Sequence, residues 1–494
     1  MTDGAGARLN ARTLVHLSAQ VGTPTYDRSQ LTAGIVHIGV GGFHRAHMAM
    51  TIDRMLSQGV GQDWAICGVG LLPGDRRMKD ILEEQDHLYT LVVRHPDGTE
   101  DVQVIGSVVD YLLAPDDPNA VVERMAAPTT KIVSLTVTEG GYNVDRVTGR
   151  FDTSQQAVAR DVAETTLETY FGLVVEALRR RRDRGIAPFT VLSCDNIEDN
   201  GDVAAAAFHA YASAKDPEFA EWLRAHVSFP NSMVDRITPV TTREDVEAIS
   251  GSIGVTDAWP VVCEPFFQWV IEDDFGLGRP PWEGQGVQMV PDVRPYELMK
   301  LRLLNAGHQA LCYFGYLMDY RLVHDATNDP LIAALLARYM DEEATPTLAP
   351  VPGVDLDAYK RTLIERFSNA AVADTIARLC AESSDRIPKW LVPVVREQLR
   401  TGGSISYAAA IIASWARYAE GTDEHGAPID VVDPLRDELV PLARRQRADP
   451  SAFIANQRLF GGLADDPRFL DAYLEVLRSL HEHGARETLR VLTN

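Results

Sequence analysis

Three polar residues, Lys300, Asn305 and His308, stand in a leucine-rich segment and carry groups that can exchange a proton with a ligand or hydrogen-bond to it. At about 100° per residue in an α-helix, these three residues and Glu297 fall within an arc of about 140°. The helical rise of about 1.5 Å per residue places Lys300 about 12 Å from His308 along the axis, and a lysine side chain covers much of that distance. One small ligand can therefore contact all three side chains.

The same spacing is also compatible with a purely structural role. A lysine on an apolar helix can direct its ammonium group to solvent, and a buried asparagine or histidine is normally held by hydrogen bonds. Ionisable groups in apolar surroundings mark functional sites only as a tendency. The choice between a ligand site and a polar core therefore depends on the rest of the chain.

Strand and helix patterns alternate over the first part of the chain. Short apolar runs indicate buried strands, and segments with apolar residues at helical spacing lie between them. We expect strands at 35–40, 64–69, 102–109, 132–137 and 189–194, and helices at 43–56, 121–125, 159–182 and 203–214. This order predicts an α/β domain with a parallel, Rossmann-like sheet.

Helical patterns dominate the second part of the chain. They occur at 296–320, 330–340, 356–365, 370–380, 405–418 and 470–483. The Pro- and Gly-rich segment 279–286 separates the two parts, as expected of a domain boundary. We expect a Rossmann-like dinucleotide-binding domain with extensions over residues 1–289 and a mainly α-helical substrate-binding and catalytic domain over residues 290–494.

The first predicted strand ends in a glycine turn with the sequence Gly39-Val40-Gly41-Gly42-Phe43-His44. Gly39 allows a tight turn, and Gly41 lets the backbone approach a pyrophosphate, whose charge the following helix N-terminus stabilises. His44 stands where the dinucleotide fingerprint has its third glycine. We expect Gly39, Gly41, Gly42 and Phe43 to contact a dinucleotide, although an ordinary strand-to-helix turn has the same pattern.

An acidic residue after the second strand decides which dinucleotide such a turn prefers. Asp75 follows the predicted strand at 64–69 and can accept hydrogen bonds from ribose hydroxyls, which favours NAD over NADP. Arg76 and Arg77 beside it oppose this preference, because arginine binds phosphate well. Asp75 also fits as the N-cap of a helix that begins at Arg76.

The composition argues against several classes of function. The chain of 494 residues is 45% hydrophobic and can bury a large core. Its formal net charge of −23 opposes binding to nucleic acid or to anionic membranes. No segment approaches about 18 uninterrupted apolar residues, and the first 20 residues lack a leader pattern. The five scattered cysteines form no CxxC pair, so we expect a cytoplasmic protein with no disulfide framework and no cysteine zinc site.

Five motifs in order along the chain carry a family resemblance. They are Gly39-Val40-Gly41-Gly42-Phe43-His44-Arg45-Ala46-His47, Thr138-Glu139-Gly140-Gly141-Tyr142, Ser193-Cys194-Asp195-Asn196, Met233-Val234-Asp235-Arg236-Ile237-Thr238-Pro239 and Lys300-x4-Asn305-x2-His308. Together they resemble the polyol-specific long-chain dehydrogenases, above all the members that oxidise mannitol, over residues 10–485. The resemblance implies an NAD-dependent enzyme that interconverts D-mannitol and D-fructose, needs no metal and is a monomer.

The resemblance also implies catalytic roles for four residues. Lys300 resembles the family's acid/base, Asn196 and Asn305 resemble the pair of amides that stabilise the oxyanion, and His308 resembles the group that orients the substrate. A free lysine has a pKa near about 10.4, so Lys300 must be desolvated to act as a base at mildly alkaline pH. We expect the two amides to meet on one oxygen when a cleft between the domains closes.

The substrate-binding residues follow from the same resemblance. Asp235, Arg378 and Arg386 align with positions that contact polyol hydroxyls, and Glu297 aligns with a glutamate that lines a water path to the lysine. The chain departs from the pattern at Gly74, where an acid often precedes the ribose aspartate. It departs again at Arg386, where relatives can have lysine. The strictness of NAD selectivity and the sugar specificity therefore stay open.

Other activities of the same family share this chemistry. They are the reduction of fructuronate or tagaturonate and the oxidation of D-arabinitol or D-sorbitol. A hexuronate would favour added positive charge in the pocket, which Arg378 and Arg386 can provide, although both can equally donate to neutral hydroxyls. A protein that only senses NADH would not need Lys300 together with two oxyanion donors.

Two further residue pairs invite other interpretations. Tyr211 and Lys215 resemble the tyrosine–lysine pair of short-chain dehydrogenases, but we expect these i,i+4 neighbours on a polar, solvated helix face. His44 and His47 have the spacing of a metal-binding pair on a helix, but no thiolate or carboxylate at ligand spacing completes a site. We therefore expect neither a short-chain active site nor a metal.

Overall fold

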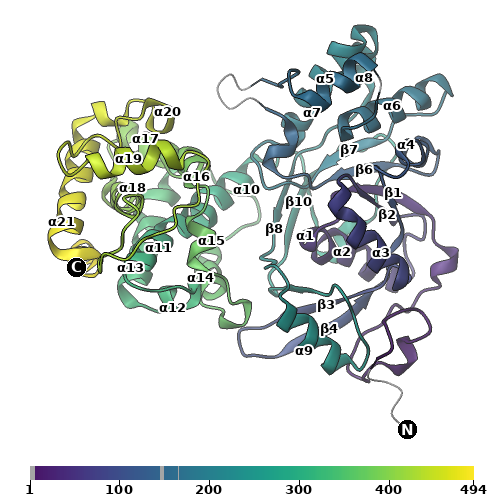
Figure 1. The fold of residues 1–494 in the computed structure, drawn as a ribbon, viewed down its shortest axis with the longest axis horizontal. Coiled ribbons are helices and arrows are strands. Elements are labelled where there is room, and N and C mark those ends of the chain that lie inside the picture. The colour runs from purple at the N-terminus through teal and green to yellow at the C-terminus, as the bar shows by residue number, and fades with distance from the viewer. Residues whose placement is uncertain (1–5, 145–149, 165) are drawn as a thin grey trace. The chain divides into compact units, whose positions relative to one another are not determined.

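The computed structural model describes residues 6–144, 150–164 and 166–494, which form two compact units, Met1–Arg294 and Pro295–Asn494 (Figure 1). The first unit is an α/β fold and the second is mainly helical, which confirms the predicted fold class. Among the described residues, no helix is both long enough and apolar enough to cross a membrane.

A five-stranded parallel sheet forms the centre of the first unit, with the strand order β5-β2-β1-β6-β7. Its strands are β1 (Ala33–Ile38), β2 (Ala65–Gly70), β5 (Val108–Leu113), β6 (Ile132–Leu135) and β7 (Thr190–Ser193). Every residue of β1, β2, β6 and β7 is buried. Continuous apolar strands of this kind are typical of parallel sheets that are covered on both faces.

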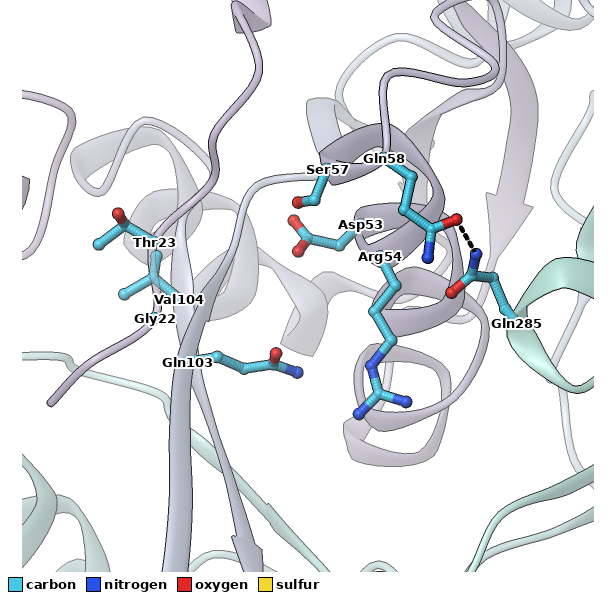
Figure 2. A pocket seen from close by; sticks show the side chains of 9 residues that line it. All are labelled: Gly22, Thr23, Asp53, Arg54, Ser57, Gln58, Gln103, Val104 and Gln285. Carbon is cyan, nitrogen blue, oxygen red and sulfur yellow. Dashed lines mark hydrogen bonds between the residues drawn. The ribbon is translucent and has the colours of Figure 1, made fainter.

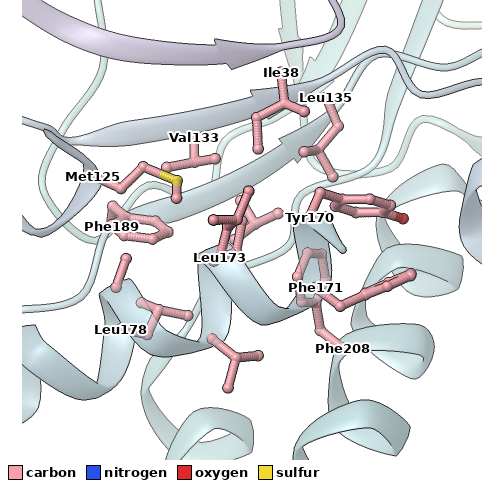
Figure 3. Packing of buried hydrophobic residues seen from close by; sticks show 14 of the residues in the cluster. Ile38, Met125, Val133, Leu135, Tyr170, Phe171, Leu173, Leu178, Phe189 and Phe208 are labelled. Carbon is pink, nitrogen blue, oxygen red and sulfur yellow. The ribbon is translucent and has the colours of Figure 1, made fainter. Parts of the chain in front are cut away.

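Helices cover this sheet. They include α1 (Gly42–Ala46), α2 (Met48–Ser57), α3 (Arg76–Glu84), α4 (Pro118–Ala126), α5 (Gln156–Glu164), α6 (Tyr170–Asp183), α7 (Asn200–Lys215) and α8 (Pro217–His226). Figure 3 shows Leu173 and Leu178 of α6 in the cluster of buried residues that includes Val133 and Leu135 of β6. The helix predicted over 43–56 is divided into α1 and α2, because His47 leaves the helical conformation with φ −120° and ψ −91°.

Two smaller sheets complete the first unit. One has the order β4-β3-β9, with β3 (Tyr89–Arg94), β4 (Glu100–Ile105) and β9 (Val261–Cys263), and the other has the order β11-β10-β8, with β8 (Ser232–Asp235), β10 (Gln268–Glu272) and β11 (Gln288–Val290). The single strand predicted at 102–109 was wrong. The chain leaves β4 at Gly106 and enters β5 of the central sheet at Val108, and β-branched residues on both sides of the turn hid this boundary.

The second unit is built around one interrupted helix. It starts as α10 (Arg294–Met299), widens into the π-helical turn η6 (Lys300–Asn305) and continues as α11 (Ala306–Leu317). The other helices are α12 (Val323–Thr327), α13 (Pro330–Arg338), α14 (Leu356–Phe367), α15 (Ile376–Cys380), α16 (Ser383–Trp390), α17 (Val392–Thr401), α18 (Ser406–Tyr418), α19 (Arg436–Arg445), α20 (Gln457–Phe460) and α21 (Pro467–Leu492). In the uninterrupted helix predicted over 370–380, Ala373 has φ +50° and divides the segment, so α15 starts only at Ile376.

Candidate active site

In the first unit, two predicted cofactor residues, one predicted catalytic residue and one further motif residue follow the carboxyl ends of neighbouring strands. Gly39 follows β1, Asp75 follows β2, Thr138 follows β6 and Asn196 follows β7. The strands are parallel, so these ends lie along one edge of the sheet. Ligands of open α/β sheets bind at this edge. The fold therefore brings the glycine turn, the acidic residue and one of the two amides to the same edge.

The glycines of the turn differ in what they make possible. Gly39 has φ +93°, and a Cβ atom there would lie 2.2 Å from the carbonyl oxygen of Thr136, so only glycine fits. A Cβ at Gly41 would have no neighbour closer than 3.9 Å, and one at Gly42 would make an ordinary contact of 3.6 Å with Thr238. Gly39 is thus required by the fold, whereas Gly41 leaves open space beside the backbone.

His44 takes the place of the third glycine by stacking. Its ring lies 3.5 Å from the ring of His37 on β1, with an interplanar angle of 8°. The two nitrogens of His37 hydrogen-bond to Ser134 Oγ at 2.8 Å and Thr136 Oγ1 at 3.0 Å. Burial lowers the pKa of His37 to about 3 and the pKa of His44 well below its usual value, so both rings are neutral. Two flat neutral rings let the helix approach the strand closely.

Asp75 lies where the sequence predicted a ribose-binding acid. Its Oδ2 accepts hydrogen bonds from the backbone N–H groups of Leu71 and Leu72, both at 2.8 Å. Asp75 is the N-cap residue of α3, but its side chain makes no capping bond to that helix. The neighbouring arginines are both engaged, because Arg76 pairs with Asp116 and Arg77 lies 4.6 Å from the centre of the Trp259 ring.

The residue that fixes the segment of Asn196 is Asp195, for which no role was predicted from the sequence. The buried carboxylate of Asp195 accepts hydrogen bonds from the N–H groups of Val137 and Thr138, at 3.1 and 2.8 Å, and from the hydroxyl of Tyr142 at 2.7 Å. It therefore joins two of the five motifs. Its only signal in the sequence was its position directly before Asn196, whose side chain is exposed.

Asp235, the last residue of β8, is buried.

In the second unit, Lys300 and Asn305 are the first and last residues of the π-helical turn η6. An α-helix would separate these positions by about 140°. A π-helix bonds residues that are five apart, so Lys300 and Asn305 come closer to one line along the axis, and single π turns occur frequently at functional sites. Lys300, Asn305 and Glu297 are buried, with 5, 4 and 4% of their surface exposed.

Two nitrogens of this helix, Asn305 Nδ2 and His308 Nε2, are among the buried polar atoms that have no hydrogen-bond partner in the described part of the chain. The His308 ring packs against Phe367, with 4.6 Å between the ring centres. Burial lowers the pKa of His308 well below its usual value, and the positive charges of Arg378, Arg366, Arg386 and Lys300 lower it further. The alternative of a hydrogen-bonded polar core is therefore not met at these two atoms.

The predicted substrate arginines, Arg378 and Arg386, lie close enough to His308 for their charges to lower its pKa. Arg378 Nε donates to Asp374 Oδ1 at 2.6 Å, and its Nη2 also pairs with Asp374. Burial opposes the charge of Arg378, but this ion pair prevails and raises its pKa. Arg386 Nη1 donates to the carbonyl oxygen of Leu379 at 3.0 Å, and Nη2 lies 3.6 Å from a Glu382 oxygen.

The tyrosine–lysine pair of α7 was placed wrongly in the sequence analysis. Tyr211 is fully buried in the core of the first unit, and the Lys215 ammonium donates to the carbonyl oxygen of Asp161 at 3.0 Å. The predicted solvated face therefore does not exist at Tyr211. The described ranges contain no group of three or more His, Cys, Asp or Glu side chains that could hold a metal ion.

A separate cavity of about 290 Å³ lies at the C-terminal end of α2 and beside β4. Figure 2 shows Asp53, Arg54 and Gln103 among the side chains that line it. Gln285 Nε2 donates to Gln58 Oε1 at 2.8 Å. None of the predicted cofactor or substrate residues lines it.

Comparisons with known proteins agree with this arrangement. The family model of the mannitol dehydrogenase Rossmann domain matches residues 33–284, and the model of the mannitol dehydrogenase C-terminal domain matches residues 292–481. A mannitol 2-dehydrogenase of Aspergillus fumigatus is 43% identical, over 98% of this chain and 99% of the relative. A mannitol dehydrogenase of Saccharomyces cerevisiae is also 43% identical, over 96% of this chain and 95% of the relative.

Two solved structures have the same fold over nearly the whole chain. Mannitol 2-dehydrogenase of Pseudomonas fluorescens, in a ternary complex with NAD and D-mannitol, matches with a TM-score of 0.90 and 44% identity, over 98% of this chain and 99% of that chain. A D-sorbitol dehydrogenase in substrate-free form matches with a TM-score of 0.90 and 39% identity, over 97% of this chain and 100% of that chain. The chain therefore belongs to the mannitol dehydrogenase family and is an oxidoreductase.

Proposed function

We propose that this enzyme interconverts D-mannitol and D-fructose by hydride transfer with NAD. The observation that carries the proposal is the pair of unsatisfied nitrogens, Asn305 Nδ2 and His308 Nε2, on the same interrupted helix as the buried Lys300. Buried polar atoms are normally satisfied, so two such atoms beside an ionisable group favour a polar ligand. The relative from Pseudomonas fluorescens, which holds NAD and D-mannitol, supports the choice of ligands.

In this proposal the side chains divide the reaction between them. Lys300, as the neutral amine, accepts the proton of the substrate hydroxyl during oxidation and returns it as the ammonium during reduction. The amides of Asn196 and Asn305 donate to the oxygen on which negative charge develops, and each such donor contributes about 3 kcal/mol. His308 orients the hydroxyl groups, while Glu297 supplies the water path to the lysine. NAD, when bound, supplies the hydride acceptor.

The cofactor preference rests on the surroundings of Asp75. Its Oδ2 is used by two backbone N–H groups, which leaves Oδ1 for a ribose hydroxyl. The extra phosphate of NADP needs a cationic partner, but Arg76 and Arg77 are engaged with Asp116 and with Trp259. These contacts support NAD over NADP. We propose that the glycine turn, Gly39 to Phe43, binds the pyrophosphate.

The charge around the substrate arginines favours a neutral substrate over a hexuronate. Arg378 is paired with Asp374, and Arg386 lies 3.6 Å from Glu382. Both guanidinium groups keep N–H donors for hydroxyls, and Asp235 in the first unit is proposed to accept from them. One chain carries every proposed residue, so we also propose that the enzyme works as a monomer, in the cytoplasm, without metal or nucleic acid.

Initial rates of NADH oxidation with D-fructose, D-xylulose and D-fructuronate, repeated with NADPH, test the proposal. The expected result is preference for D-fructose with NADH. A preference for D-fructuronate would show that the enzyme is a hexuronate reductase. No activity with any ketose would leave only NADH binding, as in a redox sensor. Sedimentation of the active enzyme at assay concentration tests whether it is a monomer.

A further inference from the structure

We propose that Asp374 determines the charge of the substrate that this site accepts. By pairing with Arg378 it reserves the site for neutral polyols and ketoses and disfavours ketoses that carry a carboxylate. This inference rests on the proposed function, because it takes Arg378 as a substrate contact. It assigns Asp374 a positioning role, since the carboxylate orients Arg378 and compensates its charge and is not itself proposed to bind the substrate.

The backbone around Asp374 is held on both sides by the segment that leads into α12. The N–H of Val323 donates to the carbonyl oxygen of Asp374 at 2.9 Å, and the N–H of Ile376 donates to the carbonyl oxygen of Arg321 at 3.0 Å. The carboxylate is fixed as well, because its Oδ1 accepts from the N–H of Thr375 at 2.8 Å. Only 9% of Asp374 is exposed. Asp374 is therefore set in place independently of the arginine.

The arginine is the more exposed partner of this pair. Its side chain is 51% exposed, and its Nε and Nη2 both bind the carboxylate, a two-point contact that fixes the plane of the guanidinium group. The third nitrogen, Nη1, makes no hydrogen bond within the described part of the chain. The Asp374 pair therefore leaves the N–H groups of Nη1 as donors for a ligand and carries no net charge.

Charge, rather than the number of donors, separates the two kinds of substrate. His308 experiences the positive charges of Arg378, Arg366, Arg386 and Lys300, so the surroundings of the helix are already cationic. A hydroxyl needs only the aimed Nη1 donor, whereas a carboxylate also gains from uncompensated positive charge. Removing the negative charge of Asp374 while keeping its shape should therefore improve binding of an anionic ketose and leave a neutral ketose with a less well aimed donor.

The Asp374→Asn variant tests this prediction, with kcat and KM measured for D-fructose and D-fructuronate in the presence of NADH. The ratio of kcat/KM for D-fructuronate to that for D-fructose should rise at least tenfold over the unaltered enzyme, mainly through KM. The increase should shrink at high salt, because salt screens charge. Asp341→Asn is the matched control, since Asp341 is exposed on the same unit and pairs with Lys360. Its ratio should stay unchanged.

Arg378→Gln gives an independent test, which also serves if Asp374→Asn does not fold. It leaves the Asp374 charge uncompensated, so the same ratio should fall at least tenfold. In the Arg378→Gln background, adding Asp374→Asn removes the second charge of the pair, so the ratio should return toward that of the unaltered enzyme. An unchanged ratio in Asp374→Asn, or no recovery of the ratio in the double variant, would overturn the role of Asp374. Failure of the unaltered enzyme to reduce D-fructose would instead overturn the proposed function.

Discussion

Two regions position their polar groups in different ways. One is the sheet edge of the first unit that carries Gly39, Asp75 and Asn196, and the other is the interrupted helix of the second unit that carries Lys300 and Asn305. At the edge the main chain determines the geometry, because Gly39 allows a turn that no other residue fits and Asp195 is saturated by three hydrogen bonds. On the helix, a π turn sets Lys300 and Asn305, and the Asn305 nitrogen stays unsatisfied. Saturated groups hold the fold, whereas unsatisfied groups are available to a ligand.

This difference has a consequence for substitutions. Removing a saturated group leaves its partners buried without hydrogen bonds, which costs about 1–3 kcal/mol for each such group. Removing a group that has no partner leaves nothing behind, so stability should be kept while activity is lost. The helix and the edge can therefore be told apart by measuring stability and turnover on the same variants.

The largest effect is expected at the lysine. Lys300→Ala should lower kcat by about a thousandfold, because general acid–base catalysis contributes about 10²–10⁴. Steady-state rates with D-fructose measure this loss. Lys360→Ala, on an ion-paired lysine of α14, is the control with unchanged kcat. Near-normal turnover in Lys300→Ala would contradict the assignment.

A pair of asparagines sharpens the comparison. Asn305→Ala should lower kcat by about 10²–10³ with unchanged stability and NADH affinity, because its donor is used only when charge develops on the substrate. Asn200→Ala should do the reverse, since Asn200 Nδ2 donates to the carbonyl oxygens of Asp195, at 3.0 Å, and Ser232, at 2.7 Å. Its loss should cost about 2–4 kcal/mol of stability, as two buried acceptors lose their donor. Urea unfolding measures the stability of both variants, and titration with NADH measures their cofactor affinity. Equal losses of stability in both variants would make Asn305 structural.

The sequence predicted the fold class because alternating apolar strands and periodic helices are local patterns. The same patterns do not report where the chain changes sheets, so the β4 and β5 strands were merged into one. They also do not separate π from α geometry, because the leucines around Lys300 suit both. Tyr211 was placed on a solvated face because one polar neighbour, Lys215, outweighed the apolar packing that buries it.

The family motifs name the candidate site residues, whereas residues that act through another residue were not predicted. Asp195 binds Thr138, which lies in another segment of the chain. Asp374 binds Arg378 in a segment where the structure breaks the predicted helix. Ala373, with φ +50°, supplies that break and was predicted to be helical. Hydrogen-bond networks of this kind depend on tertiary contacts, which no local pattern contains.

Acid should affect the first unit through its stacked histidines. Folding lowers the pKa of His37 to about 3, so the unfolded chain, with a histidine pKa near 6.5, binds the proton first. Stability is therefore full above about pH 6.5 and is lost as pH falls, by about 2 kcal/mol for His37 at pH 5. His44→Phe keeps a flat ring against His37 and removes one titrating group. Its urea midpoint should fall less between pH 8 and pH 5 than that of the unaltered enzyme.

Exposed His16 provides the control for this experiment, because His16→Phe makes the same substitution without touching the stack. Its midpoint should follow that of the unaltered enzyme at both values of pH. If His44→Phe loses as much stability in acid as the His16 control, the stacked pair is not the acid-sensitive element of the edge.

The smallest expected changes separate the two roles of the glycine turn. Gly39→Ala should lower the melting temperature by several degrees, because φ +93° costs a side chain about 1–2 kcal/mol and the Cβ would lie 2.2 Å from the Thr136 oxygen. Gly41→Ala should leave the melting temperature unchanged, since its Cβ meets nothing closer than 3.9 Å, yet weaken NADH binding about tenfold by filling the space beside the pyrophosphate. Gly284→Ala, with no neighbour within 4 Å of its Cβ, controls for the substitution itself. Unchanged NADH affinity in Gly41→Ala would mean that the open space at the turn is not where the cofactor lies, and the edge would then be a scaffold alone.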